Sequence, residues 1–175
     1  MTGSGRSEPP PERPALAGRA AARLAAVQAL YQMKMTGESA PSVIEDFLEH
    51  RLSGADRDAA GVGLDKVDGE FFGDLVRGVA RESDDLDDML TAVLAEDWSV
   101  ERLERLLRLI LNAGAFELGH WPEVPARVVV SQYVDLAHAF LDDRQTAMVN
   151  GVLDSLARHL RPEEFEGEAL PDLTG

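Results

Sequence analysis

Residues 99–120 read SVERLERLLRLILNAGAFELGH, and their apolar side chains recur every three or four positions. This period is typical of an amphipathic α-helix that buries one face. The predicted buried face consists of Leu103, Leu106, Leu107, Ile110 and Leu111. Glu101, Arg105, Arg108 and Asn112 fall on the opposite face. The stretch therefore predicts a long helix with one apolar side and one polar side.

The same period recurs through most of the chain. It predicts further helices at residues 17–35, 42–52, 68–82, 83–94, 127–141 and 144–160. The β-branched run Val128–Val130 alone would favour a strand, but the later apolar spacing from Tyr133 to Phe140 favours a helix. The connections are mostly short, which favours antiparallel neighbours. We therefore expect an all-α fold, a compact bundle of about seven helices.

Composition limits the class of protein. The chain has 175 residues, 45% of them hydrophobic, which is enough for one domain with a buried core. The absence of cysteine excludes disulfides, cysteine-ligated metal centres and a cysteine nucleophile. No apolar run approaches the roughly 20 residues of a membrane span, and the N-terminus lacks an apolar signal segment. We therefore expect a cytoplasmic protein with no membrane partner.

The two ends of the chain differ from its middle. Residues 1–15 are polar and rich in proline, which predicts a disordered N-terminal segment. Residues 16–161 contain the predicted helices and form the predicted domain. Residues 162–175 carry five acidic side chains and no basic one, which predicts a flexible acidic tail.

Charge is distributed unevenly along the chain. The net charge is −15, which argues against broad contact with nucleic acid. Residues 1–35 are the exception, with five basic and two acidic side chains. Within them, Arg19 and Arg23 share a helix face, and Lys34 returns to nearly the same angle three turns later. This stripe is either an ordinary solvated surface or a contact for phosphates, and spacing alone leaves both interpretations open.

No enzyme motif is found in the sequence. The four histidines lie far apart and lack the spacing of metal ligands. No glycine-rich phosphate loop follows a strand, and no G-x-S-x-G sequence occurs. We therefore expect no catalytic residue, no metal and no cofactor. Asn150–Gly151 is unusual inside a predicted helix, and we expect a close helix contact at Gly151 to explain it.

Five short segments share their order and spacing with one protein family. They are ARLAAVQALYQ at 22–32, FFGDLVRGV at 71–79, LILNAGAFEL at 109–118, VPARVVV at 124–130 and MVNGVLD at 148–154. Together they resemble the NusB family of bacterial transcription antitermination factors. The resemblance implies two small helical bundles packed together. It also implies a protein that, with ribosomal protein NusE, binds boxA-type single-stranded RNA of nascent ribosomal RNA transcripts in an RNA polymerase antitermination complex.

The resemblance also implies roles for individual residues. The residues implied to contact RNA are Arg19, Arg23 and Arg108. The residues implied to contact NusE are Tyr31, Glu101 and Met148. These six positions are the candidate site.

Two alternatives remain open. One is a helical protein–protein adaptor of the same family with weak or lost RNA binding, because Ala20, Ala21 and Asn112 stand where arginines are common in the family. The other is the NusB-like domain that precedes some ribosomal RNA methyltransferases. We do not expect a full enzyme of that kind, because no α/β domain follows the helices.

Overall fold

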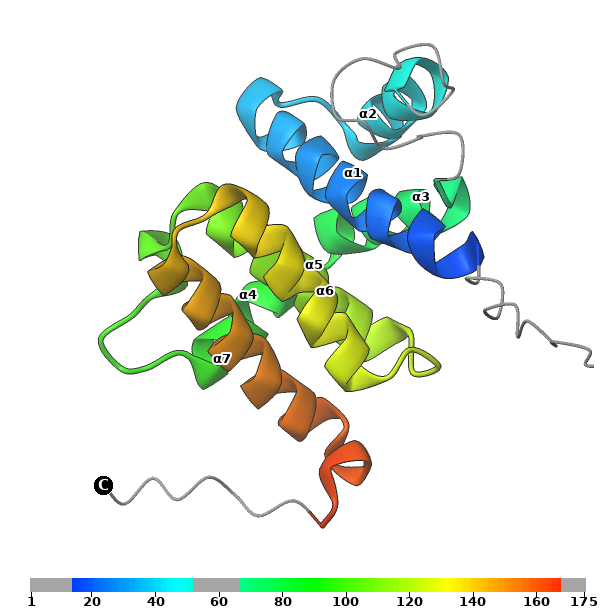
Figure 1. Cartoon of the computed structure of the whole chain (residues 1–175). Helices are drawn as coiled ribbons and strands as arrows, with labels where there is room; N and C mark the ends of the chain where they lie inside the picture. Colours follow the sequence, from blue (N-terminus) through cyan, green and yellow to red (C-terminus); the bar gives the residue numbers. More distant parts are fainter. Residues whose placement is uncertain (1–13, 52–66, 168–175) are drawn as a thin grey trace, which may run out of the picture.

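The computed structural model describes residues 14–51 and 67–167, which are almost entirely helical (Figure 1). The α-helices are α1 (Pro14–Thr36), α2 (Ala40–Asp46), α3 (Gly69–Arg81), α4 (Ser83–Val93), α5 (Arg105–His120), α6 (Ala126–Phe140) and α7 (Asp143–Leu160). Three short turns of other helix types are η1 (Phe47–Arg51), η3 (Val100–Arg102) and η4 (Pro162–Phe165). The described residues contain no strand. The predicted all-α fold is therefore confirmed.

Local side-chain and backbone chemistry sets several helix ends. Asp68 accepts a hydrogen bond of 3.0 Å from the backbone N–H of Phe71 at the start of α3. Asp142 and Gln145 form a capping box at the start of α7. These contacts satisfy backbone N–H groups that have no partner inside the helix. Gly37 ends α1, because its φ of +76° suits glycine.

Helix α5 lies between two groups of helices (Figure 1). It packs against α1 and α3 on one side, where α2 completes the group, and against α4, α6 and α7 on the other. From Leu107 to Leu118, every residue of α5 except Arg108 is buried. The predicted arrangement of two small bundles is therefore confirmed, with α5 as their shared centre.

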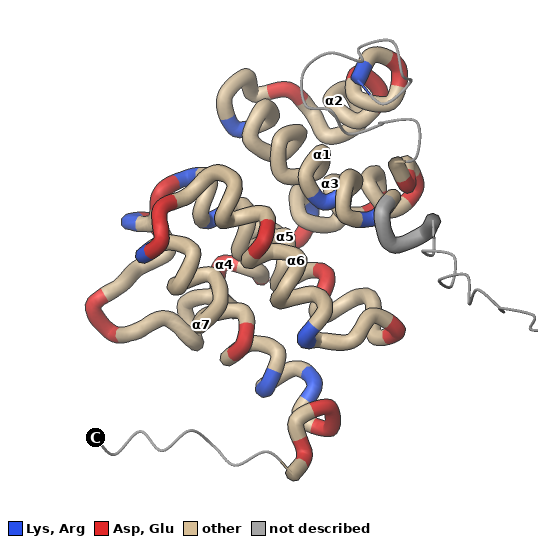
Figure 2. The backbone as a smooth tube through the Cα atoms, in the orientation of Figure 1, with Lys and Arg blue, Asp and Glu red and all other residues tan. Residues whose placement is uncertain are grey.

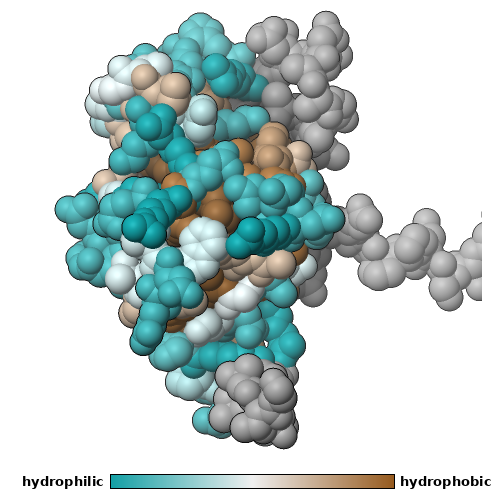
Figure 3. All heavy atoms as spheres, turned by 90° about the vertical axis from the view of Figure 1, so that its left-hand side faces the viewer, coloured by the Kyte–Doolittle hydropathy of each residue, from teal (hydrophilic) through white to brown (hydrophobic). Residues whose placement is uncertain are grey.

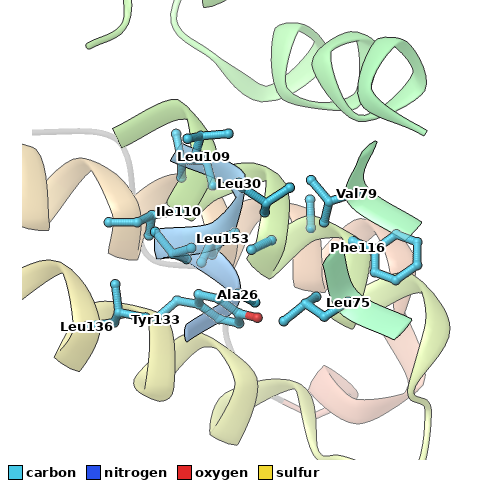
Figure 4. Packing of buried hydrophobic residues seen from close by; sticks show 14 of the residues in the cluster. Ala26, Leu30, Leu75, Val79, Leu109, Ile110, Phe116, Tyr133, Leu136 and Leu153 are labelled. Carbon is cyan, nitrogen blue, oxygen red and sulfur yellow. The ribbon is translucent and has the colours of Figure 1, made fainter. Parts of the chain in front are cut away.

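The two bundles share one continuous apolar core (Figure 4). Gly78 of α3 lets Phe116 of α5 lie directly against it, because a Cβ at Gly78 would come within 1.9 Å of a ring carbon. Gly114 of α5 has the same role toward Leu153 of α7, because a Cβ at Gly114 would lie 2.8 Å from a methyl carbon of Leu153. These two glycines therefore set how closely α3 and α7 approach the central helix.

Three local predictions need correction. The stretch 99–120 is not one helix, because the backbone at Leu103 is extended (φ −68°, ψ 140°) and separates η3 from α5. Helix α1 begins at Pro14, inside the segment predicted to be disordered, and the preceding residues lie outside the described ranges. The predicted close helix contact at Gly151 is wrong, since a Cβ there would meet nothing within 4 Å.

The residues directly after α7 are anchored to the domain. Phe165 is buried, with the guanidinium groups of Arg127 and Arg158 over its ring. Glu164 accepts a hydrogen bond of 2.7 Å from the first backbone N–H of α6. The prediction of a flexible tail is therefore wrong for η4, because these contacts hold it. The remainder of that predicted tail, residues 168–175, lies outside the described residues.

Arg161 ties the end of α7 to the loop between α5 and α6. Its side chain is buried, and its Nε donates to the carbonyl of Leu118 at 2.9 Å. Its terminal nitrogens donate to the carbonyls of Trp121, at 2.8 Å, and Val124. One arginine therefore satisfies a carbonyl in the last turn of α5 and two carbonyls in the loop that follows, and it fixes the position of that loop.

Candidate functional site

Arg19 is the first of the two α1 arginines assigned to RNA by resemblance. Its side chain is 27% exposed near the start of the helix. The guanidinium carbon lies 4.9 Å from the centre of the Phe71 ring, and Nε lies 3.9 Å from an Asp68 carboxylate oxygen. Arg19 is therefore held at the junction of α1 and α3, where an anion can still reach it.

Arg23, one turn further along α1, is only 3% exposed. Its Nε and Nη2 donate to the two carboxylate oxygens of Glu117 on α5, at 2.9 and 2.5 Å. The Tyr133 hydroxyl of α6 donates to the same carboxylate at 2.8 Å. Arg23 therefore lies in the core and not on an exposed basic stripe with Arg19, because α1 packs against α5 at this level.

The environment fixes the protonation of this network. Burial lowers the pKa of Arg23, but the hydrogen bond and charge of Glu117 more than offset it, so the pKa is raised. Burial raises the pKa of Tyr133 well above its ordinary value, and the charge of Glu117 raises it further. Arg23 therefore remains a cation and Tyr133 a neutral phenol near pH 7. The network joins both bundles through a buried ion pair.

Glu117 and Tyr133 were not predicted to act together with Arg23. The available signal was a single glutamate inside the apolar run 109–118. Charged side chains are almost never fully buried unless they are paired, so that glutamate implied a cationic partner. Its identity could not be inferred, because Arg23 lies 94 positions away in the sequence.

Arg108 of α5 lies at the edge of the second bundle with its side chain 36% exposed. Its Nε donates to Asp87 of α4 at 3.1 Å, and its Nη2 contacts the same carboxylate. The hydrogen bond to Asp87 raises the pKa of Arg108. Asn112 donates to Asp87 at 3.3 Å, and its own buried Oδ1 has no partner in the described part of the chain. Arg108 is therefore already paired, and only part of its guanidinium faces solvent.

An apolar hollow of about 190 Å³ lies between α1, α5 and α6. We call it the α1–α6 hollow, and its lining residues are Leu24, Val27, Gln28, Tyr31, Leu106 and Phe140. Tyr31 and Phe140 remain 39% and 50% exposed there. Figure 3 views the side of the molecule where α6 ends and α7 begins, and it shows apolar surface recessed among polar side chains. Exposed aromatic side chains beside an apolar hollow are typical of a protein-binding surface.

The other two residues assigned to NusE lie outside the lining of this hollow. Glu101 is exposed on η3, and Met148 of α7 is partly buried against the core. A hydrogen bond of 2.7 Å from Gln145 to Glu104 joins the first turn of α7 to the residue before α5. Phe140 and Leu106 were not predicted as site residues, because helical spacing cannot distinguish an exposed apolar side chain from a core one.

The described residues lack two further kinds of feature. Within 14–51 and 67–167, no group of three or more His, Cys, Asp or Glu side chains could hold a metal ion. No helix in these ranges is long and apolar enough to cross a membrane.

Comparisons with known proteins agree with this architecture. The Transcription antitermination protein NusB of Rhodopseudomonas palustris (strain TIE-1) is 46% identical over 147 residues, which cover 84% of this chain and 83% of the relative. The solved structure of T. maritima NusB has a TM-score of 0.67 and 25% identity, and the match covers 85% of this chain and 96% of that one. A crystal structure of antitermination factors NusB and NusE in complex with dsRNA shares the fold, with a TM-score of 0.63, 24% identity, and coverage of 81% and 96%. A model of the NusB family matches residues 20–158, and the chain belongs to the NusB family.

Proposed function

We propose that this protein is a transcription antitermination factor that works with NusE on boxA-type RNA of nascent ribosomal RNA transcripts. The observation that carries the proposal is the family match over residues 20–158, together with 46% identity to a relative of that name. The solved complex of NusB, NusE and dsRNA has the same fold. We place the protein in the cytoplasm, in the RNA polymerase antitermination complex, and assign it a binding role with no catalytic step.

We assign the α1–α6 hollow to NusE. Binding energy in protein interfaces concentrates in a few large side chains that seat in well-packed pockets. Tyr31 and Phe140 are such side chains, and both line this apolar hollow. Glu101 of η3 and Met148 of α7, which lie outside the lining of the hollow, remain proposed contacts for NusE.

We assign RNA contact to Arg19 and to the exposed edge of Arg108. Both arginines already face a carboxylate, from Asp68 and Asp87 respectively. Figure 2 shows basic positions scattered among acidic ones across both bundles. The net charge of −15 also repels RNA at long range. The protein alone therefore binds RNA weakly, and NusE supplies further contacts.

Transcription through a terminator tests this function. A template with boxA upstream of a terminator is transcribed by the cognate RNA polymerase with all other factors, with and without this protein. Read-through rises when the protein is added, and a template with a scrambled boxA removes the increase. Equal read-through with and without the protein would contradict the proposal.

A protein adaptor without RNA binding is the second candidate. The observation that favours it is the burial of Arg23, which leaves fewer arginines for phosphates than the sequence indicated. An adaptor of this kind binds NusE but leaves the affinity of NusE for boxA RNA unchanged. Calorimetric titration of NusE with this protein, repeated in the presence of RNA, distinguishes the two candidates.

A further inference from the structure

A groove between α3 and the end of α5 has no role in the function proposed above. Its volume is about 250 Å³, and we call it the α3–α5 groove. Its lining residues are Asp74, Arg77, Gly78, Arg81, Phe116, His120 and Trp121. Of these seven residues, three have side chains that can carry a positive charge and one is acidic. This balance is opposite to that of the whole chain, whose net charge is −15.

Two exposed arginines form the α3 side of the groove. The side chains of Arg77 and Arg81 are 53% and 70% exposed. Each lies 3.3 Å from a carboxylate oxygen, of Asp74 and Glu82 respectively. Such exposed ion pairs are weak, so each guanidinium can exchange its carboxylate for a phosphate.

Aromatic rings form the α5 side. His120 stacks on Phe116, with ring centres 3.9 Å apart and planes 19° apart. Phe116 is 3% exposed, whereas the His120 side chain is 41% exposed, so the imidazole is the outer ring of the stack. The imidazole is also held through Nδ1, 2.9 Å from the Phe116 carbonyl, and Nε2, 3.3 Å from Glu82. A nucleobase can therefore stack on a ring whose orientation is already set.

The aromatic side of the groove continues to Arg19. The Trp121 ring centre lies 5.6 Å from that of Phe116 and 4.9 Å from that of Phe71. The Phe71 ring in turn lies beneath the Arg19 guanidinium, 4.9 Å away. These contacts connect Arg19 to the groove through three rings, of which Phe71 and Phe116 are buried and Trp121 is partly exposed. Surfaces that bind single-stranded nucleic acid combine the same two kinds of side chain.

We propose that the α3–α5 groove binds single-stranded RNA, with Arg77 and Arg81 on phosphates and His120 stacked on a base. This inference rests on the proposed antitermination function and extends its RNA path beyond Arg19. Cations in the last turns of α3 and α5 also offset the helix dipoles, but that effect does not require a groove or an outer aromatic ring. An acidic protein segment would use the arginines and leave the stacked imidazole unused.

Charge reversal of the two arginines tests the phosphate contacts. Arg77→Glu with Arg81→Glu is compared with Arg51→Glu with Arg102→Glu, which changes the net charge equally outside the groove. Labelled boxA RNA is titrated with each variant bound to NusE, by fluorescence anisotropy over a range of salt. The groove variant binds about tenfold more weakly or worse at low salt, and its salt slope falls by about 1.4, because each phosphate contact contributes about 0.7. The control stays within about twofold of wild type, since it loses only long-range attraction.

Ring substitutions test the stacking. His120→Ala weakens RNA binding about fivefold or more, and His120→Phe restores it, because an aromatic face is what the base requires. A 2-aminopurine probe in the RNA is quenched by wild type and by His120→Phe, and it is not quenched by His120→Ala. If the glutamate pair lowers the melting temperature, Arg77→Gln with Arg81→Gln replaces it.

Each outcome decides one proposal or both. If wild type with NusE binds boxA RNA and the groove variant binds equally well, the groove inference is wrong and the antitermination proposal stands. If the groove variant instead loses NusE binding, the groove is a protein contact and the inference is also wrong. If wild type with NusE shows no affinity for boxA RNA, both proposals fail together.

Discussion

Arg19 and Arg23 lie one turn apart on α1, and they differ in burial and in the carboxylate that each faces. Arg19 is partly exposed beside Phe71 and Asp68. Arg23 is buried in an ion pair with Glu117. The two share a helix face, so the difference comes from what packs against each turn of α1. Helical spacing therefore determines the direction of a side chain, and the neighbouring helix determines whether it belongs to the surface or to the core.

Removal of the buried counter-ion is the strongest way to test this difference. Glu117→Ala lowers the free energy of unfolding by about 3–5 kcal/mol, because it leaves the Arg23 guanidinium buried without a partner. Arg19→Ala, the matched change at the surface, stays within about 0.5 kcal/mol of wild type. Urea unfolding measures both. A similar loss for the two variants would contradict the assignment of Arg23 to the core.

Two glycines give the same comparison between core and surface, since Gly78 is in close contact with a neighbouring ring and Gly151 faces open space. Gly78→Ala destabilises the fold by about 1–3 kcal/mol, because its Cβ overlaps the Phe116 ring and forces a shift. Gly151→Ala faces open space on α7 and stabilises the fold by up to about 1 kcal/mol, since alanine favours a helix over glycine. Thermal unfolding monitored by circular dichroism measures both changes in stability, and the melting temperature falls for Gly78→Ala and rises for Gly151→Ala. Equal destabilisation by both would show that Gly151 also has a close neighbour.

Tyr31 tests whether an exposed side chain of α1 contributes to binding rather than to stability. Tyr31→Ala weakens NusE binding by about 1–2 kcal/mol, because it removes a large side chain from the α1–α6 hollow. Titration calorimetry measures this loss, and the melting temperature is the control. A fall in melting temperature with unchanged NusE affinity would instead assign Tyr31 to the core.

The smallest expected effect is a pH dependence of the melting temperature, and it comes from Glu164 in η4. The hydrogen bond from the backbone of Ala126, and then Arg161, lower the pKa of Glu164 below its ordinary value of 4.5. A lowered folded-state pKa contributes stability above the unfolded value, and that stability is lost as pH falls through the folded value. The melting-temperature difference between wild type and Glu164→Gln therefore shrinks below about pH 4.5. Glu163→Gln, the same change at the exposed neighbouring residue, is the matched control.

The helical fold could be predicted from the sequence because each helix must bury one face. That requirement repeats every three or four residues, so it is visible locally. The start of α5 could not be predicted in this way. Leu103 is buried in both the predicted and the observed arrangement, and apolar spacing alone does not reveal that its backbone is extended.

The candidate site was predictable only in part, because its decisive contacts are long-range. Resemblance to the family identified Tyr31, which lines an exposed hollow. It also assigned Arg23 to RNA, although Glu117, 94 positions away, takes that side chain into the core. The α3–α5 groove depends on Arg77 and His120 lining it from two different helices, and the spacing within each helix does not reveal that they lie together.

The affinity of boxA RNA for this protein, measured by anisotropy with and without NusE, tests the central claim most directly. The account predicts weak binding by the protein alone, since Arg23 is buried, Arg19 and Arg108 each face a carboxylate, and the net charge is −15. It predicts at least about tenfold tighter binding when NusE is present, the size of a typical coupling between two sites. Equal affinity in the two conditions would contradict a joint RNA surface and would leave the protein without the role proposed for it.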